Sequence, residues 1–362
     1  MPNQRRKRIS QTQIAVELGY SQALVSMVLN GRKQGISEAA YNRIWNFAIT
    51  HGYSPRGMAI NNVVRQSASP TIAYILRAPL KLANKSNFFN HIHQGLFDHL
   101  ESQGVKMMFL GSEDNIDADQ LPDEIRASHN ISGIAIMGEV QPAFLNKVAK
   151  IGLPITYISA RATGVCHSVL ANEQQSLSLL VEHLVGLGHR KFAWLGGNKT
   201  MGRHSERYQS LLNALDDHGI ELDPKHEVKL AGADRMEGFN AAKTIAEVAS
   251  EDLPTAWICL NGLMARGAVS YLFQNGFQVP RDISVAAVDM TNVCTEESPQ
   301  ITCASASPEQ MGEEAAQMLL ESINEKKTSL MDITLPSQIK VLESTGPARK
   351  PALQPSLDSR KA

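Results

Sequence analysis

Residues 10–30 read SQTQIAVELGYSQALVSMVLN, and this stretch has the pattern of two short helices joined by a tight turn. Ser10 with Gln13 three residues later forms a capping-box pattern, and apolar residues then recur at helical spacing. Gly19 is suited to the left-handed conformation that ends a helix, and Ser21 is suited to cap the next helix. The stretch therefore predicts a helix-turn-helix, which places one helix in the major groove of DNA.

The second of these helices is expected to span about residues 22–30. Its apolar side is formed by Val25, Val28 and Leu29, so the opposite side faces outward and carries Gln22, Ala23, Ser26, Met27 and Asn30. Ser37 is expected to cap a third helix, whose apolar residues at three-to-four spacing close a small core.

Charge is distributed unevenly along the chain. Residues 1–66 contain nine lysines and arginines against two acidic residues, a net charge of +7, whereas the whole chain has a net charge of −1. A basic head on an acidic body is typical of a polyanion-binding module joined to a larger module that does not bind polyanions. Charge alone also allows a merely solvated basic arm.

Length and composition indicate a soluble protein of several units. The chain has 362 residues, 43% hydrophobic and 20% charged, which fits two or three packed domains. The four cysteines are widely spaced with no C-x-x-C, a pattern that fits a reducing compartment. The sequence has neither a signal-peptide pattern nor an apolar run of about 18 residues, so we expect a cytoplasmic protein without a membrane partner.

From about residue 69 the pattern alternates between strands and helices. Expected strands include 71–76, 105–110, 133–137 and 155–158, followed by a second series that begins with helix 173–186 and ends with strand 284–288. This rhythm predicts parallel sheets covered by helices on both faces. Two such series in tandem predict a two-lobed α/β binding protein with a ligand in the cleft.

Two sets of motifs resemble the lactose/galactose repressor (LacI/GalR) family of bacterial transcription regulators. The head carries Ile14-Ala15, Gly19-Tyr20-Ser21, Val25-Ser26, Val28-Leu29-Asn30, Ser37 and Gly52-Tyr53-Ser54-Pro55. The body carries His183-Leu184, Gly188-His189-Arg190-Lys191, Arg207, Asn261, Asp289 and Pro299-Gln-Ile-Thr302, in family order up to about residue 345. The resemblance implies an all-α helix-turn-helix domain followed by a two-lobed, periplasmic-binding-protein-like body.

The domain limits follow from this resemblance. It implies a DNA-binding domain at 1–55, a hinge helix or linker at 56–68, and an effector-binding and dimerisation body at 69–345. Residues 346–362 are rich in Pro, Ser, Arg and Lys and are expected to form a disordered tail. Without DNA, the hinge is also expected to be a disordered linker.

The resemblance also implies which residues touch DNA. Gln22, Ala23 and Met27 would reach base edges, whereas Ser21, Ser26 and Asn30 would approach phosphates. Arg32 and Lys33, in the following loop, are further phosphate candidates or ordinary solvated charges, and the hinge candidates are Met58, Ala59 and Asn62.

Ala23, Met27 and Asn62 depart from the family's pattern at positions that would read or wedge bases. Met27 stands where the family often has an arginine, so we expect contact with a thymine methyl or lost specificity at that base pair. Asn62 stands where the family has the leucine that wedges between base steps, so a neighbouring valine wedges instead or DNA bending is weaker.

The implied effector contacts are Arg207, Asn261 and Asp289, which point into the cleft in the family. Each has a structural alternative, because Arg207 could pair with Asp289, and Asn261 could cap the helix that follows it. Arg77 and Arg203 add positive charge near the cleft, which hints at an anionic or otherwise unusual effector, or at none.

The sequence lacks the motifs of the common enzyme classes. It has no G-x-S-x-G, no G-x-x-x-x-G-K-[ST], no H-E-x-x-H, and no G-x-G-x-x-G after a strand, so we expect no catalytic residues, cofactor or metal. His91 and His93 are read as surface histidines rather than metal ligands. The prediction is a homodimeric, operator-binding regulator, most simply a repressor, controlled by a sugar or related metabolite. The alternatives are a solute-binding sensor with weakened DNA specificity and a catalytic body tethered to a DNA-binding head.

Overall fold

The chain divides into two units, Met1–Ala68 and Ser69–Ala362, which we call the head and the body. A computed structural model describes residues 10–29, 35–50, 70–77, 87–127, 130–197, 202–249, 252–325 and 329–349.

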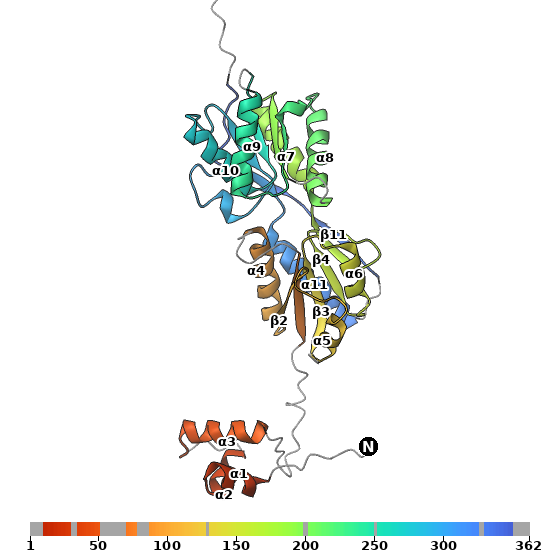
Figure 1. Ribbon diagram of the computed structural model, residues 1–362, viewed down its shortest axis with the longest axis vertical. Coiled ribbons are helices and arrows are strands. Elements are labelled where there is room, and N and C mark those ends of the chain that lie inside the picture. The colour runs from red at the N-terminus through yellow and green to blue at the C-terminus, as the bar shows by residue number, and fades with distance from the viewer. Residues whose placement is uncertain are drawn as a thin grey trace, which may run out of the picture. The chain divides into compact units, whose positions relative to one another are not determined.

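The head contains helices α1 (Gln11–Leu18), α2 (Gln22–Leu29) and α3 (Glu38–Thr50) (Figure 1). The capping box at α1 is present, because Ser10 Oγ accepts from the backbone N–H of Gln13 at 3.2 Å and Gln13 Oε1 accepts from that of Ser10 at 2.9 Å. Gly19 ends α1 with φ +71°. Ser21 Oγ then accepts from the N–H of Leu24 at 3.2 Å and begins α2.

The three helices of the head share one small core. Ile14, Val25, Val28 and Ile44 are fully buried in it. Because α2 buries Val25, Val28 and Leu29, its opposite side is left to face outward, as its helical periodicity predicts.

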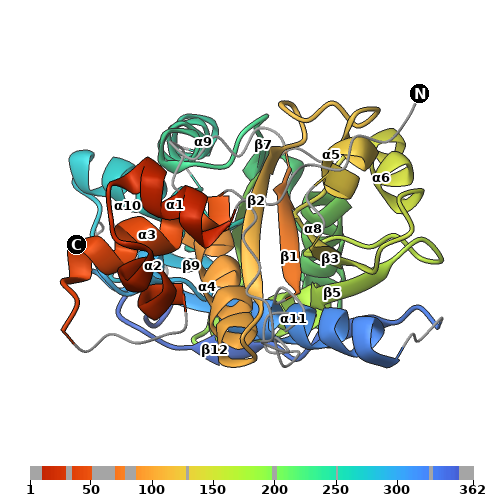
Figure 2. The same ribbon diagram turned by 90° about the horizontal axis from the view of Figure 1, so that it is seen from below.

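Lobe 1 of the body is built on a six-stranded sheet of order β11-β5-β4-β3-β1-β2. Its strands are β1 (Thr71–Leu76), β2 (Lys106–Ser112), β3 (Ile131–Met137), β4 (Ile155–Ile158), β5 (His167–Ala171) and β11 (Asp332–Leu335). Helices α4 (Asn87–Ser102) and α11 (Pro308–Glu325) cover one face, and α5 (Leu121–Ala127) and α6 (Pro142–Ala149) cover the other (Figure 2). Successive residues of β1 enter different cores, Ile72 on one side and Ala73 on the other, as in a sheet buried on both faces.

Lobe 2 repeats this plan with a second six-stranded sheet, of order β12-β10-β9-β8-β6-β7. Its strands are β6 (Phe192–Gly196), β7 (Glu227–Lys229), β8 (Ala256–Cys259), β9 (Ser284–Ala287), β10 (Thr302–Ser305) and β12 (Gln338–Lys340). Its helices pack in two pairs, α7 (Glu173–Gly186) with α8 (Gly202–Asp216) and α9 (Arg235–Val248) with α10 (Gly262–Gln274) (Figure 1). All strand pairs are parallel except β10 with β12.

The described body is not two lobes in tandem, which corrects the expectation from the sequence. The chain passes from β5 of lobe 1 to α7 of lobe 2, returns from β10 to α11, and crosses again from β11 to β12. Lobe 1 is therefore completed by α11 and β11, which come after the strands of lobe 2. Non-local pairing of this kind leaves no periodic signal in the local sequence.

The sequence pattern placed the start of the disordered tail too early, at residue 346. Gly346–Arg349 belong to the folded body: the carbonyl oxygen of Gly346 lies 3.0 Å from His189 Nε2, and the N–H of Ala348 donates to the carbonyl of Leu187 at 2.9 Å. Arg349 donates to Asp282 at 2.8 Å. Backbone hydrogen bonds to lobe 2 hold these residues despite their Pro- and Lys-rich surroundings, while residues 350–362 lie outside the described part. Across the described residues, no helix combines the length and apolar character needed to cross a membrane.

Candidate functional site

A cavity of about 230 Å³ lies between the two lobes of the body. It is lined from lobe 1 by residues at or after the carboxyl ends of β3, β4 and β5, and from lobe 2 by the first turns of α7 and α8. Half of its lining residues are charged, and the whole set is Glu139, Ser159, Ala160, Arg161, Leu170, Ala171, Glu173, Gly202, Arg203 and Glu206. Ligands of parallel α/β sheets bind outside the carboxyl ends of the strands, so this cavity is the candidate ligand site.

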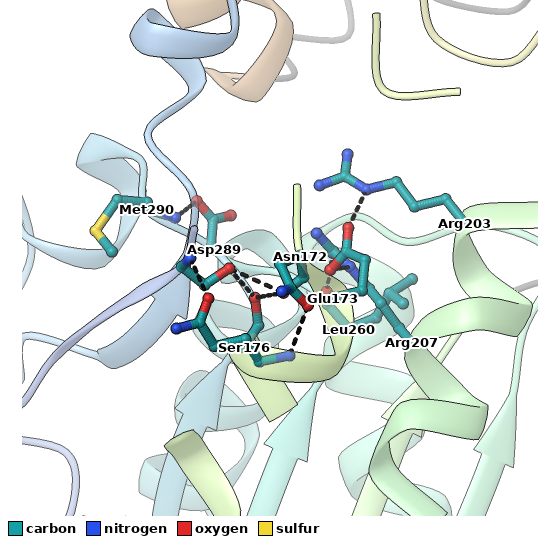
Figure 3. A network of polar contacts seen from close by, with 10 residues as sticks. Asn172, Glu173, Ser176, Arg203, Arg207, Leu260, Asp289 and Met290 are labelled. Atoms are coloured by element: carbon teal, nitrogen blue, oxygen red, sulfur yellow. Dashed lines mark hydrogen bonds and ion pairs between the residues drawn. The ribbon is translucent and has the colours of Figure 1, made fainter. Parts of the chain in front are cut away.

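A buried ion-pair network centred on Glu173 forms one wall of the cavity (Figure 3). Arg203 Nε donates to Glu173 Oε1 at 2.7 Å, and Arg207 Nε donates to Glu173 Oε2 at 2.8 Å. Arg207 Nη1 also donates to the carbonyl oxygen of Leu260 at 2.5 Å. The carboxylate of Glu173 is only 3% exposed, so a single buried anion holds two guanidinium groups of α8 against α7.

The pKa values of both Glu173 and Arg203 lie below their ordinary values, and both groups are charged at neutral pH. Burial on its own would raise the pKa of Glu173, but Arg207 and Arg203 together hold it below its ordinary value. Burial, followed by the like charge of Arg207, lowers the pKa of Arg203 to about 10. Arg203 thus remains a cation at neutral pH, paired with an ionised Glu173.

The structure pairs Arg207 with Glu173 and not with Asp289, which corrects the alternative pairing considered from the sequence. Asp289 Oδ2 accepts from the backbone N–H of Gly262 at 2.9 Å, and its Oδ1 accepts from those of Met290 at 2.7 Å and Thr291 at 2.6 Å. These three bonds tie the loop after β9 to the start of α10. Neither Arg207 nor Asp289 lines the cavity, although Arg207 supports Glu173, which does.

Asn261 acts as the cap of α10. Its Oδ1 accepts from the N–H of Met264 at 2.9 Å, and its Nδ2 donates to the carbonyl oxygen of Ala233 at 2.8 Å. Both ends of the amide are therefore used within lobe 2, and Asn261 is not among the residues that line the cavity.

Arg77, expected at the cleft, follows β1 and does not line the cavity. Burial lowers its pKa, and nearby Glu139, Tyr157 and Glu113 counteract that effect. Of the five predicted effector contacts, only Arg203 lines the cavity. Its charge is already matched by Glu173, and three carboxylates line the same space, so the sequence hint of an anionic effector loses its support.

Two contacts join the start of α8 to lobe 1. The guanidinium carbon of Arg203 lies 4.2 Å from the centre of the Phe88 ring of α4, a cation–π contact. The backbone N–H of Gly202 donates to Glu139 Oε2 at 2.8 Å, which places a carboxylate at the amino-terminal end of the helix. The cavity is thus bounded by side chains that also hold the lobes together.

In the head, the outward face of α2 carries the residues predicted to contact DNA. Ser21, Gln22, Ala23 and Met27 are exposed and Ser26 is half-buried, with 38% of the apolar Met27 accessible. Asn30, Arg32, Lys33, Met58, Ala59 and Asn62 lie outside the described residues, so their roles remain predictions.

Sequence reasoning missed Glu173 and Glu206, which lie at the cavity. Glu173 follows the helix cap Asn172, whose Oδ1 accepts from the N–H of Gln175 at 3.0 Å. Acidic residues are common in the first turn of a helix, where they interact favourably with the helix dipole, so Glu173 did not stand out as a site residue. Glu206 lies between Arg203 and Arg207 in the sequence. Because residues three apart share a helix face, its spacing from Arg203 could have indicated that Glu206 also faces the cavity. Ser159, another lining residue, has an unusual positive φ of 64°.

A serine–histidine pair in lobe 1 lies beside a second cavity of about 450 Å³ but is arranged for structure rather than catalysis. His167 Nδ1 accepts from the N–H of Met331 at 3.2 Å, so the proton resides on Nε2, which faces Ser322 Oγ at 3.0 Å. Ser322 Oγ in turn donates to the carbonyl of Met318 at 2.7 Å. A histidine in this tautomer is a donor to the serine and is not placed to accept its proton.

His91 and His93, considered from the sequence as possible metal ligands, contact other protein side chains. His91 Nδ1 lies 2.5 Å from Glu309 Oε1, and His93 packs edge-on against Tyr74 with ring centres 5.1 Å apart. Within the described ranges, no three His, Cys, Asp or Glu side chains are grouped to hold a metal ion.

Comparisons with known proteins agree with this architecture. Residues 181–345 match the model of the periplasmic binding protein-like domain. The HTH-type transcriptional repressor PurR of Pasteurella multocida is 23% identical over 335 residues, which cover 91% of this chain and 97% of the relative. PurR of Vibrio vulnificus is 26% identical over 317 residues, which cover 85% and 90%.

Solved structures share the fold over nearly the whole chain. The transcriptional regulator CelR in complex with cellobiose has a TM-score of 0.68 at 22% identity, covering 93% of this chain and 100% of that one. The lac repressor dimer bound to operator and an anti-inducer has a TM-score of 0.67 at 19% identity, covering 94% and 100%.

The fold and the site define a class of protein with a helix-turn-helix head and a two-lobed, periplasmic-binding-protein-like body that encloses a polar cavity. Over most of its length the chain is similar to the HTH-type repressors named PurR, and residues 181–345 match the periplasmic binding protein-like domain.

Proposed function

We propose that this chain is a sequence-specific DNA-binding transcriptional repressor whose operator affinity is controlled by a small molecule, a sugar or related metabolite, held in the cavity between the lobes. The observation that carries the proposal is the presence in one chain of an exposed recognition-helix face and a charged cavity bounded by both lobes. The relatives named PurR are repressors, and the structural neighbours include a cellobiose complex and an operator complex.

Control follows from where the cavity lies. Glu139 belongs to lobe 1 and Glu173 to lobe 2, so a ligand that touches both has a binding free energy that depends on how the lobes are arranged. A ligand can shift an equilibrium only by its differential affinity for the two states. The factor by which it changes operator affinity equals the factor by which operator DNA changes ligand affinity. The contacts of Arg203 with Phe88 and of Gly202 with Glu139 are the parts of this interface that a ligand would strengthen or replace.

The acting form is a homodimer, with two heads on a pseudo-palindromic operator. An aromatic patch on lobe 1 supports this assembly. Phe97 of α4 and Phe109 of the edge strand β2 are 38% and 40% exposed, and each packs on a neighbouring ring: His93, with centres 6.4 Å apart, and Tyr74, 4.9 Å apart. A second copy of the same patch is the self-complementary partner that a two-fold dimer requires.

The head at 1–55 would bind the major groove, residues 56–68 would form the hinge, and the body from 69 would bind effector and dimerise. Ser21, Gln22, Ala23, Ser26 and Met27 are the proposed DNA contacts of α2. The proposal places the protein in the cytoplasm with its DNA partner and assigns it no catalytic activity.

Selection of bound sequences from random DNA duplexes tests the proposal. Recovery of a pseudo-palindromic motif, with affinity that falls steeply as salt rises, is the expected result. Binding without any sequence preference would favour the alternative of a solute sensor with weakened DNA specificity, which the apolar Met27 on the exposed face makes the second candidate. Conversion of a bound metabolite into a product would favour a catalytic body.

A further inference from the structure

Two groups on one face of α8 enter the cavity without a full set of partners. Nη2 of Arg203 is buried and has no hydrogen-bond partner among the described residues. Figure 3 shows the terminal nitrogens of Arg203 directed away from Glu173, to which only Nε is bonded. Glu206, one helical turn further on, also lines the cavity and makes no hydrogen bond or ion pair within the described part of the chain.

The two groups differ in how far their charges are balanced. Arg203 has a carboxylate at 2.7 Å and an aromatic face at 4.2 Å, so its free N–H group requires only a neutral acceptor. Glu206 has no counter-charge in contact. Burial and then the like charge of Glu173 raise the pKa of Glu206, whereas Arg161, Arg203 and Arg207 act in the opposite direction. A cation in contact with this exposed carboxylate would favour its ionised form.

The other charged side chains at the cavity each make at least one polar contact. Glu139 accepts from the N–H of Gly202 at 2.8 Å, and Arg161 lies 3.4 Å from Asp332. Arg207 is bonded to Glu173 and to the carbonyl of Leu260. The cavity therefore presents an N–H group of Arg203 that has no acceptor, and the carboxylate of Glu206, which has no hydrogen bond or ion pair among the described residues.

We propose that the effector is a monosaccharide-sized hydroxylated amine, an amino sugar, whose hydroxyl oxygen accepts from Arg203 Nη2 and whose ammonium pairs with Glu206. This inference rests on the proposed function, since it names the ligand class of the same cavity. The volume of about 230 Å³ suits a small ligand, because drug-sized ligands occupy about 300–1,000 Å³. A uronic acid would bring a second anion to Glu206, and a neutral sugar would leave its carboxylate without an ion pair.

The test uses isothermal titration calorimetry of the full chain with matched sugars. Glucosamine, galactosamine and mannosamine are each compared with the neutral parent sugar, and glucuronic and galacturonic acids are included as anions. At least one amine is expected to bind at least about tenfold more tightly than its parent, the effect of one hydrogen bond between charged partners. The uronic acids are expected to bind more weakly than either.

Two variants separate the roles of the two side chains. Glu206→Gln should remove the preference for the amine over the parent sugar while leaving the affinity for the parent within about threefold. Arg203→Gln should weaken amine and parent alike, and it keeps the pair between Arg207 and Glu173. Glu182→Gln, at an exposed position of α7 away from the cavity, is the matched control and should change nothing.

Several results would overturn the inference. These are binding of a neutral sugar or a uronic acid in preference to every amine, a preference for the amine that survives in Glu206→Gln, or no binding of any amine at about 10 mM. Operator binding is measured in parallel. If the chain selects a palindrome but prefers a neutral sugar, only this inference fails; if it selects no DNA sequence, the proposed function fails whatever the sugars do.

Discussion

Arg207 binds Glu173, with Nε and Oε2 2.8 Å apart, although Asp289 was its expected partner. The pairing matters because Glu173 also receives Arg203, so a single carboxylate at the first turn of α7 orders two side chains of α8. Asp289 is occupied by three backbone N–H groups, so both arginines are held by Glu173.

Replacing Glu173 by Gln should destabilise the body strongly. The substitution removes the shared anion and leaves two buried guanidinium groups near one another, and breaking a buried pair in this way costs about 3–5 kcal/mol. Urea denaturation followed by circular dichroism measures the change. Glu182→Gln, an exposed change on the same helix, should lie within about 0.5 kcal/mol of the parent protein, and an equally small effect for Glu173→Gln would show that the network contributes little.

Stability should fall in acid partly through Glu173. Its folded-state pKa lies below its ordinary value, so its contribution is fully present above the unfolded pKa of about 4.3 and is lost as pH falls through the lower folded value. Denaturation midpoints measured between neutral pH and about pH 3 should decline less steeply below the unfolded pKa in Glu173→Gln. Parallel acid limbs for the two proteins would contradict this assignment.

Asn261→Ala should lower stability by about 1 kcal/mol through the lost cap of α10, with a further loss from its bond to Ala233. Asn261→Ser, which keeps a capping oxygen, should recover part of this loss. Because the amide is used within lobe 2, neither variant should change the affinity for a bound sugar by more than about threefold once folded. A selective loss of ligand binding in both variants would restore Asn261 as an effector contact.

Met27→Arg should change the base that α2 prefers. Met27 offers an apolar surface suited to a thymine methyl, whereas an arginine makes a bidentate contact with guanine worth about 1–3 kcal/mol of discrimination. Sequence selection with both proteins should show a new guanine preference at one position of each half-site. If the parent protein already prefers guanine there, the predicted orientation of the recognition helix is wrong.

Phe97→Asp and Phe109→Asp should each dissociate the proposed dimer, because a charge would be buried in the aromatic patch of both copies. Sedimentation or light scattering should report the monomer mass, and operator affinity should fall as the two heads bind independently. Val341→Asp, an exposed apolar position outside the patch, serves as the control for the added charge. Dimers that persist in both phenylalanine variants would place the interface elsewhere.

Much of the local structure followed from local sequence. The capping box of Ser10 and Gln13 and the turn at Gly19 are present, and helix 173–186 has its expected bounds. These features depend on residues within one or two turns of each other, so short-range chemistry is enough to predict them. The first turn of α8, Gly202–His204, is polar and gives no apolar periodicity that would mark the start of the helix.

Other features depend on contacts between distant residues. Helix α11 and strand β11 complete lobe 1 from the far end of the chain, and Arg266, unremarked in the sequence, is 3% exposed and donates to the carbonyls of Val293, Cys294 and Pro299. A buried arginine of this kind has no local signature, because its partners come from a loop more than twenty residues away.

The sequence by itself determined the helix-turn-helix head, its outward face and the two-sheet α/β body, since periodicity and caps act over a few residues. Only the tertiary structure decided which charges meet in the cavity. Arg207 and Asp289 are landmarks of the resemblance in the sequence, yet burial and geometry joined Arg207 to Glu173 and left Glu206 at the cavity without an ion pair among the described residues. The interaction of buried charges depends on distances between separate elements, and those distances exist only once the lobes have folded.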